Sequence, residues 1–330
     1  MSKVIIFSHE SDIDGLGSIV LGKIAFGDID YELSPNVEPQ ELKFRKYLDN
    51  KKIYDYDMVY ITDLALYNPS LDRVANDDIL KNKVKVFDHH EKAILKGCAK
   101  YDFTKIEEKD NSGKKRCATE MFYEYLKENS LIKPTNALDT FVEYTRLDDT
   151  WDWKNRDNPI YEAHDLSILF NKIGIEKYID MMVRKLNTES VFNYSDEELK
   201  LIKEKKEEYE KLLKRYISET EFFEDENGNK FGIAYAPYQY RNELPEYFRD
   251  NKVKDIKYFI TVALDKDAYG QKSYRPVERD FDVNEVAMKH NGGGHPFAAA
   301  VSITKKQREK ALTLSRREGL KYIADSSFEI

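Results

Sequence analysis

The chain has 330 residues, of which 41% are apolar and 35% are charged, which indicates a globular protein with enough sequence for two domains and excludes a disordered or membrane-embedded chain. The net charge of −8 argues against a broad basic surface for long nucleic acid, but it is compatible with a small anionic ligand. The two cysteines lack zinc-site spacing, and the apolar run at residues 4–7 is too short for a signal peptide or a membrane span, so we expect a cytoplasmic protein without a membrane partner.

In the first half of the chain, short apolar runs rich in β-branched residues alternate with stretches of helical periodicity. Runs this continuously apolar are typical of buried parallel strands, and their alternation with helices predicts a parallel α/β domain. Ligands of such domains bind beyond the carboxyl ends of the strands. The sequence predicts strands over residues 3–7, 58–61 and 83–87, and helices over residues 15–26, 116–127 and 137–146.

The second half has a different pattern. A helical stretch with a break near Gly174 is followed by a charged helix that begins near Ser195, and a hairpin signal at residues 225–228 then introduces strand-like runs. We expect strands over residues 258–264, 272–276 and 298–303, and a helix over residues 283–289. The predicted organisation is a parallel-sheet α/β domain over residues 1–155, a helical linker over residues 156–220, and a smaller mixed-sheet α/β domain over residues 221–330.

Carboxylates and histidines gather where the predicted strands of the first half end. Because neighbouring parallel strands end at one edge of the sheet, these side chains can converge there. Carboxylate oxygens together with imidazole nitrogens suit a pair of divalent cations, and several carboxylates packed together would repel one another without such ions. The candidates are His9, Asp12, Asp14, Asp63, Asp88, His89, His90 and Asp149.

Each motif also has a structural explanation. Asp12 and Asp63 are placed where a carboxylate could cap the following helix, and we interpret Trp151 and Trp153, close to Asp149, as core anchors. The adjacent pair of histidines after Asp88 is less easily explained in this way, because neutral imidazole is a metal ligand. We therefore favour the metal-binding interpretation.

A second set of polar residues lies in the second half. The glycines of the NGGGH segment, Gly292, Gly293 and Gly294, can expose backbone amides to a phosphate, and His295 can donate to a phosphate oxygen. Ser273 and Arg275 lie on a neighbouring predicted strand, and arginine binds phosphate in a bidentate manner. The alternative is that Arg275 is simply an exposed arginine.

Together these motifs resemble those of the DHH–DHHA1 phosphoesterase superfamily, in particular its oligoribonuclease (nano-RNase B) branch. The resemblance extends over nearly the whole chain: HESDIDG at 9–15, Asp63, DHH at 88–90, DDTWDW at 148–153, SYR at 273–275 and NGGGH at 291–295. It implies a catalytic DHH domain over residues 1–155 and a substrate-binding DHHA1 domain over residues 221–330. The separation of His9 and Asp12 is one residue shorter than in many members of the superfamily.

The resemblance also implies roles for the candidates. One metal ion would be bound by His9, Asp12 and Asp63, and the other by Asp14, Asp63, His89 and Asp149, with Asp148 as the alternative to Asp149. Mn²⁺ is the expected ion. Asp88 would support these ligands and His90 would lie toward the scissile phosphate, whereas Ser273, Arg275, Gly292, Gly293, Gly294 and His295 would hold the substrate.

We therefore expect a two-metal phosphodiesterase that degrades short RNA to 5′-mononucleotides, in the 3′-to-5′ direction, without binding long duplexes. Linear or cyclic dinucleotides and 3′-phosphoadenosine 5′-phosphate are alternative substrates. A nucleotide-binding sensor is the non-enzymatic alternative, and a homodimer is left open.

Overall fold

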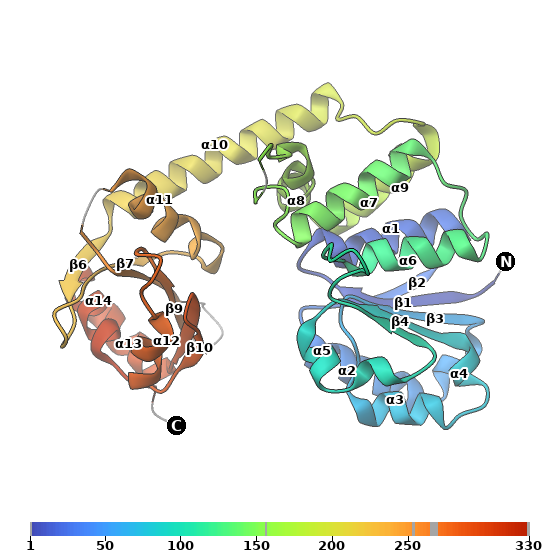
Figure 1. The fold of residues 1–330 in the computed structure, drawn as a ribbon, viewed down its shortest axis with the longest axis horizontal. Helices are drawn as coiled ribbons and strands as arrows, with labels where there is room; N and C mark the ends of the chain where they lie inside the picture. Colours follow the sequence, from blue (N-terminus) through green and yellow to red (C-terminus); the bar gives the residue numbers. More distant parts are fainter. Residues whose placement is uncertain (1, 156, 253–254, 265–269, 329–330) are drawn as a thin grey trace. The chain divides into compact units, whose positions relative to one another are not determined.

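The computed structural model describes residues 2–155, 157–252, 255–264 and 270–328. The chain forms two compact units, Met1–Lys205 and Lys206–Ile330, each with its own sheet (Figure 1). The division falls within helix α10 (Asp196–Ser218). The expected three-part division stays a prediction. Residue 156, the expected first residue of the linker, lies outside the described residues.

The first unit contains a sheet of five strands in the order β2-β1-β3-β4-β5, and every neighbouring pair is parallel. This confirms the predicted parallel α/β architecture. The strands are β1 (Val4–His9), β2 (Asp30–Ser34), β3 (Met58–Thr62), β4 (Val84–Asp88) and β5 (Thr104–Ile106).

Both faces of this sheet are buried, which explains the nearly continuous apolar runs. Along β1, Val4 and Ile6 belong to one core, whereas Ile5 and Phe7 belong to the other, because successive side chains point to opposite faces. One core includes residues of α1 (Ile13–Phe26), α6 (Ala118–Glu128), α7 (Asn136–Asp149), α8 (Tyr161–Ile173) and α9 (Ile175–Thr188). The opposite face carries α2 (Val37–Asp49), α3 (Asn68–Ala75), α4 (Leu80–Lys83) and α5 (Glu91–Leu95), as Figure 1 shows. Short 3₁₀ helices span Lys52–Asp55 and Cys98–Lys100.

The expected helix break at Gly174 is present. This glycine ends α8 and precedes α9 with a φ of 81°, a value that glycine adopts without steric cost. Both helices were expected in the linker, yet they contribute buried residues to the core of the first unit.

The second unit contains a six-stranded sheet in the order β10-β11-β9-β8-β7-β6. Only β7 and β8 pair in parallel among these neighbours, so the sheet is mixed, as predicted. The strands are β6 (Glu221–Glu224), β7 (Lys230–Tyr235), β8 (Tyr258–Ala263), β9 (Gly270–Pro276), β10 (Gly293–His295) and β11 (Ala298–Ile303). The helices are the 3₁₀ helix Tyr238–Tyr240, α11 (Glu243–Asn251), α12 (Val283–Lys289), α13 (Lys305–Thr313) and α14 (Arg316–Asp325).

Several elements were not predicted from the sequence. Residues 293–295 of the NGGGH segment form a separate edge strand, which turns at Pro296 and Phe297 and pairs antiparallel with β11. Helices α13 and α14 were not predicted, although Thr304 and Ser315 begin them with capping boxes that are visible in the sequence.

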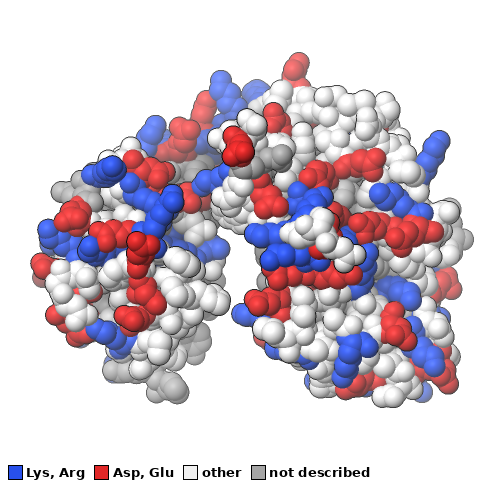
Figure 2. Space-filling view, in the orientation of Figure 1, with Lys and Arg blue, Asp and Glu red and all other residues white. Residues whose placement is uncertain are grey.

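The surface reflects the high content of charged residues. Figure 2 shows acidic and basic side chains interspersed over the visible face of both units. Within the described part of the chain, no helix combines the length and the apolar character needed to cross a membrane.

Candidate metal centre and substrate-binding residues

The carboxyl ends of β1, β3 and β4 assemble the candidate metal centre. These three strands are neighbours and parallel, so the residues that end or follow them meet at one edge of the sheet. His9 ends β1, Asp63 follows β3, and His89 follows β4. Two further carboxylates come from helix ends, since Asp14 lies in the first turn of α1 and Asp149 is the last residue of α7.

The first group of ligand atoms surrounds His9. Its Nδ1 lies 2.6 Å from Asp12 Oδ2 and 3.4 Å from Asp63 Oδ2. Its Nε2 lies 3.0 Å from the carbonyl oxygen of Pro35. When Nε2–H donates to this carbonyl, the lone pair of Nδ1 faces the two carboxylates and is available to a cation. The other oxygen of Asp12 accepts the Gly15 amide at 3.0 Å, so this carboxylate also caps α1.

The second group surrounds His89. Its Nε2 lies 3.3 Å from Asp63 Oδ1, 3.5 Å from Asp149 Oδ2 and 3.7 Å from Asp14 Oδ2. The orientation of the Asp14 carboxylate is set by the amides of Ala118 and Thr119, which donate to it over 2.8 and 2.7 Å at the start of α6. A helix N-terminus favours a negative charge, so α6 helps to keep a carboxylate in this crowded place.

Asp63 is shared by both groups. One of its oxygens faces His9 and the other faces His89, and its side chain is only 2% exposed. The residue adopts a left-handed φ of 66°, a conformation that costs free energy for most side chains and occurs most often at functional positions. This geometry fits a carboxylate that lies between two cations.

The donor set fits metal ions. Three overlapping groups of carboxylate and histidine residues each offer ligand atoms that lie within 4.8 Å of one another. Moreover, Asp63 Oδ2 and Asp149 Oδ2 are buried without a hydrogen-bond partner in the part of the chain that the structure describes. A buried carboxylate oxygen without a partner costs free energy, and a bound cation would remove that cost. These clusters could therefore hold metal ions.

The ionisation of these groups leads to the same conclusion. Burial alone would lower the pKa of His9, but Asp12 and Asp63 raise it to about 11. Burial likewise opposes protonation of His89, yet Asp63 and the other carboxylates raise its pKa to about 11. Burial and then the charge of Asp63 raise the pKa of Asp14 to about 7. So much negative charge is concentrated here that protons are held tightly unless cations replace them.

Asp88 differs from the other carboxylates of the centre because it accepts three backbone amides and also contacts the ring of His90. Its Oδ2 accepts the Ala65 amide at 2.8 Å, and its Oδ1 accepts the amides of His89 and His90 at 2.7 and 3.1 Å. The same Oδ1 lies 2.7 Å from Nδ1 of His90. Asp88 thus orients the two histidines. The side chain of His90 is 51% exposed, with its Nδ1 4.0 Å from Asp63, so its imidazole borders the cluster.

The structure places Asp149 in the cluster and directs Asp148 elsewhere. Asp148 accepts a hydrogen bond from the Ser167 hydroxyl, and its other oxygen lies 2.6 Å from Nδ1 of His164. His164 is not one of the residues that the sequence singled out. It supports the end of α7, and its distance along the chain from Asp148 left no local signal of this contact.

The two tryptophans differ in their environment. Trp153 is a core anchor as predicted, with 8% of its surface exposed, but Trp151 is 40% exposed and has a φ of 61°. The interpretation as core anchors is therefore wrong for Trp151. The reason is that α7 ends at Asp149 and the chain reverses at once, which turns Trp151 outward.

In the second unit the sheet brings the remaining candidates onto adjacent strands. Ser273 of β9 pairs with Ala300 of β11, which also pairs with Gly293 of β10. The Ser273 side chain is buried, with its hydroxyl 3.5 Å from Gln271 Oε1. His295, at the end of β10, is exposed.

Two of the three glycines of this segment, Gly292 and Gly294, are required by close packing. A Cβ on Gly292 would lie 2.3 Å from the carbonyl oxygen of Ala300, and one on Gly294 would lie 2.3 Å from that of Ala298. The Gly292 amide already donates to the Ala287 carbonyl at 2.9 Å, so a phosphate would have to use other donors of the segment.

Arg275 lines a pocket of about 390 Å³. Its Nε donates to Asn242 Oδ1 and its Nη1 to the Tyr274 carbonyl, both over 2.9 Å. Among the described residues no carboxylate forms an ion pair with this guanidinium, and burial followed by the charge of Arg241 lowers its pKa. The sequence did not single out three other residues of this pocket, which come from separate elements: Arg249, Arg279 and Phe297.

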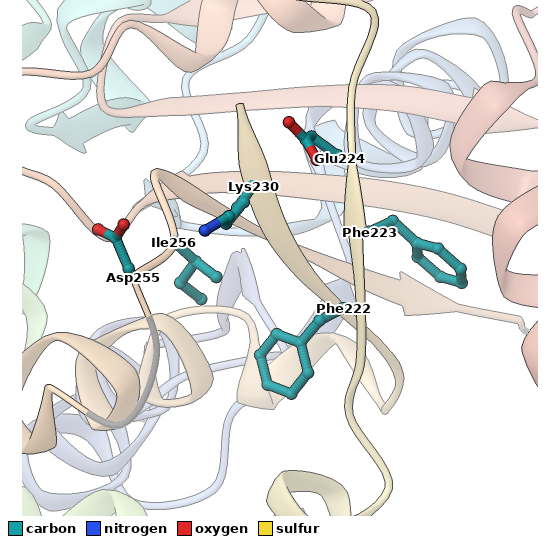
Figure 3. A pocket seen from close by; sticks show the side chains of 6 residues that line it. All are labelled: Phe222, Phe223, Glu224, Lys230, Asp255 and Ile256. Carbon is teal, nitrogen blue, oxygen red and sulfur yellow. The ribbon is translucent and has the colours of Figure 1, made fainter. Parts of the chain in front are cut away.

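Another pocket of the second unit, of about 340 Å³, lies at the edge strand β6 and is shown in Figure 3. Phe222 and Phe223 point to opposite sides of the strand there. Its charged lining residues are one lysine, Lys230, and two carboxylates, Glu224 and Asp255. Because the negative charges outnumber the positive one, this pocket is a poorer phosphate site than the pocket at Arg275.

Comparisons with known proteins agree with this architecture. A family model described as the DHHA1 domain matches residues 242–318. Oligoribonuclease NrnB of Bacillus subtilis (strain 168) is 33% identical to the chain over 303 residues, which cover 91% of the chain and 72% of NrnB.

Two solved structures share the fold at low identity. The DHH domain of a member of the s1p family of ribosomal proteins is 15% identical, with a TM-score of 0.55 over 99% of this chain and 88% of that one. The pGpG-specific phosphodiesterase PggH of Vibrio cholerae is 16% identical, with a TM-score of 0.51 over 98% of this chain and all of that one. With the similarity to NrnB over most of both sequences, these findings show that the chain belongs to the DHH–DHHA1 phosphoesterase superfamily, in its oligoribonuclease NrnB-like branch.

Proposed function

We propose that the chain is a two-metal phosphodiesterase that degrades short oligoribonucleotides to 5′-mononucleotides from the 3′ end. The observation that carries this proposal is the arrangement around Asp63, whose two oxygens face His9 on one side and His89 on the other. A carboxylate shared in this way is typical of sites that hold two cations a few ångströms apart. The similarity to an oligoribonuclease supports RNA as the substrate.

In this proposal some residues bind the metal ions and others contact the phosphate. His9, Asp12 and Asp63 would hold one ion. Asp14, Asp63, His89 and Asp149 would hold the other, since all three carboxylates lie within 3.7 Å of His89 Nε2. Two divalent ions, for which Mn²⁺ is our choice, would activate water and neutralise charge on the phosphoryl oxygens. Asp88 fixes the backbone and the ring of His90 and raises the pKa of its imidazole, which lies half-exposed beside the centre. With Nδ1 donating to Asp88, the protonated ring can donate a second hydrogen bond from Nε2 to a phosphate oxygen.

The second unit would bind the substrate. The pocket at Arg275 is lined by three arginines and one glutamate, so an anion is favoured there, and the exposed ring of Phe297 at its edge offers a surface for a base. Its volume of about 390 Å³ suits a small ligand better than an extended strand. This supports short substrates, in agreement with the acidic net charge of the chain.

Hydrolysis of an RNA length series tests the proposal. RNAs labelled at the 5′ end, from two to about 24 nucleotides, are compared with cyclic dinucleotides and 3′-phosphoadenosine 5′-phosphate at equal concentration, with Mn²⁺ and after EDTA treatment. We expect the shortest RNAs to be degraded fastest and EDTA to abolish the reaction. Attack from the 3′ end releases the labelled mononucleotide last, whereas attack from the 5′ end releases it first.

Two results would contradict the proposal. Full activity after thorough EDTA treatment would exclude the metal centre as the catalyst. Tight metal binding without turnover of any of these substrates would favour the nucleotide-binding sensor.

A further inference from the structure

Trp151, two residues after the candidate ligand Asp149 in the chain, exposes a large aromatic ring to solvent. It is 40% exposed, although tryptophan is usually well buried. It follows Asp149, whose Oδ2 lies 3.5 Å from His89 Nε2, by two positions in the chain. Two peptide units span at most about 7.6 Å between Cα atoms, so the backbone of Trp151 lies close to that of the candidate ligand Asp149.

The backbone at Trp151 is in a conformation that glycine would adopt more easily. Its φ is 61°, and it follows Thr150, the C-cap of α7. Glycine is the usual residue at this position after a helix, and a side chain there costs roughly 1–2 kcal/mol. Helix termination alone would therefore not select an exposed tryptophan here.

A column of rings supports Trp151 from the inner side. Its ring stacks on Trp153, with centroids 6.5 Å apart and an interplanar angle of 28°. Trp153 is buried and stacks on His164, with centroids 4.5 Å apart and an angle of 7°. His164 in turn contacts Asp148, which is adjacent to Asp149. The orientation of the exposed ring is therefore coupled to the element that carries a candidate metal ligand.

We infer that Trp151 is a stacking platform for the nucleobase next to the phosphate at the metal centre, and that it selects substrates that carry a base. This inference rests on the proposed function and deepens it. A preoriented aromatic ring binds any of the four bases through its face, which suits an enzyme that removes nucleotides without regard to sequence. Stacking of this kind contributes about 1–3 kcal/mol per base, which corresponds to roughly 5- to 150-fold in affinity.

The chain offers a direct reporter, because Trp151 and Trp153 are its two tryptophans. Indole fluorescence is titrated in the presence of Mg²⁺ with 5′-AMP and with ribose 5-phosphate, which carries the same phosphate but no base. We expect quenching by 5′-AMP only. The quenching should persist in Trp153→Phe and disappear in Trp151→Phe, which retains a ring for binding but lacks the reporter.

Affinity measured by calorimetry gives the second test. Trp151→Ala should lower the affinity for 5′-AMP about ten-fold and leave that for ribose 5-phosphate unchanged, whereas Trp151→Phe should restore most of the loss. Tyr161→Ala is the matched control, because Tyr161 is 60% exposed and contacts Trp153 from another direction. It should leave both affinities unchanged.

The stacking role is overturned if Trp151→Ala keeps the wild-type preference for 5′-AMP over ribose 5-phosphate. It is also overturned if both ligands quench the fluorescence equally. Hydrolysis of the RNA length series by the unmodified protein is a separate readout, so failure of the proposed function is distinguished from failure of this inference.

Discussion

Replacing Asp63 with asparagine tests the metal centre most directly. Asparagine has nearly the same shape and is one of the few residues that tolerate the left-handed φ of 66° at this position, so the backbone should remain in place. The substitution removes one negative charge from a side chain that is 2% exposed and faces two histidines, at 3.4 Å from His9 and 3.3 Å from His89. Both proposed ion sites therefore lose the same ligand charge.

The expected effect on stability follows from mass action. An ion at 100 times its Kd stabilises the native state by about 2.7 kcal/mol. For a unit of this size, about 1 kcal/mol shifts Tm by roughly 2–4 °C, so Mn²⁺ should raise the Tm of the unmodified protein by about 5–10 °C. In Asp63→Asn this rise should largely disappear. In the absence of metal, the lost attraction to the two imidazoles is offset by relief of repulsion from the neighbouring carboxylates, so the Tm should stay close to that of the unmodified protein.

The assay combines thermal unfolding, with and without Mn²⁺, and hydrolysis of a short RNA. We expect turnover to fall by on the order of 10³-fold. Asp78→Asn makes the same chemical change at a carboxylate that is 94% exposed in the same unit, and it should leave both readouts unchanged. Full turnover together with an undiminished Mn²⁺-induced Tm shift in Asp63→Asn would refute the assignment of a shared carboxylate.

Three further perturbations address other parts of the molecule. Arg275→Ala should raise KM for short RNA about 10- to 100-fold with little change in kcat, since it removes a phosphate donor in the second unit. Steady-state kinetics that show a loss confined to kcat would contradict this prediction. Asp88→Asn should reduce kcat about 10- to 100-fold while metal binding, measured by calorimetry, persists, because in the proposed assignment this carboxylate orients His90 and its neighbours and is not a metal ligand. An inactive variant that binds no metal would instead make Asp88 a ligand. Burial lowers the pKa of Lys272 from its ordinary 10.5 to about 7, so between these values the unfolded chain binds the extra proton and the free energy of unfolding rises with pH. Denaturant unfolding at several pH values should show a weaker rise in Lys272→Met, and an identical pH dependence would mean that the buried amine remains charged.

Local patterns in the sequence predicted much of the fold and many of the residues of the candidate metal centre. Nearly continuous apolar runs located β1, β3 and β4, because a strand buried on both faces has few polar positions along it. The ends of those strands then located His9, Asp63 and the Asp88–His90 segment, since parallel neighbours end at a common edge. Helix α13 was missed despite its capping box, because its apolar periodicity is weak, whereas α14 was missed although both its capping box and its apolar periodicity are visible in the sequence.

Other features depend on contacts between residues that are far apart in the chain. The orientation of Asp14 is set by the amide of Thr119, which is 105 positions away. The pocket at Arg275 gathers Arg249 and Phe297 from separate elements, and no local spacing reveals that they meet.

The sequence by itself determined which residue types are available for metal binding and at which strand ends they lie, because strand periodicity and strand ends are local properties. Only the tertiary structure decided that Asp149 rather than Asp148 joins the cluster, that Asp63 faces two histidines, and that Trp151 is exposed while Trp153 is buried. These choices between near neighbours depend on strand register, on where a helix ends and on the packing of distant elements, so residues with the same local environment in the sequence can face opposite directions in the fold.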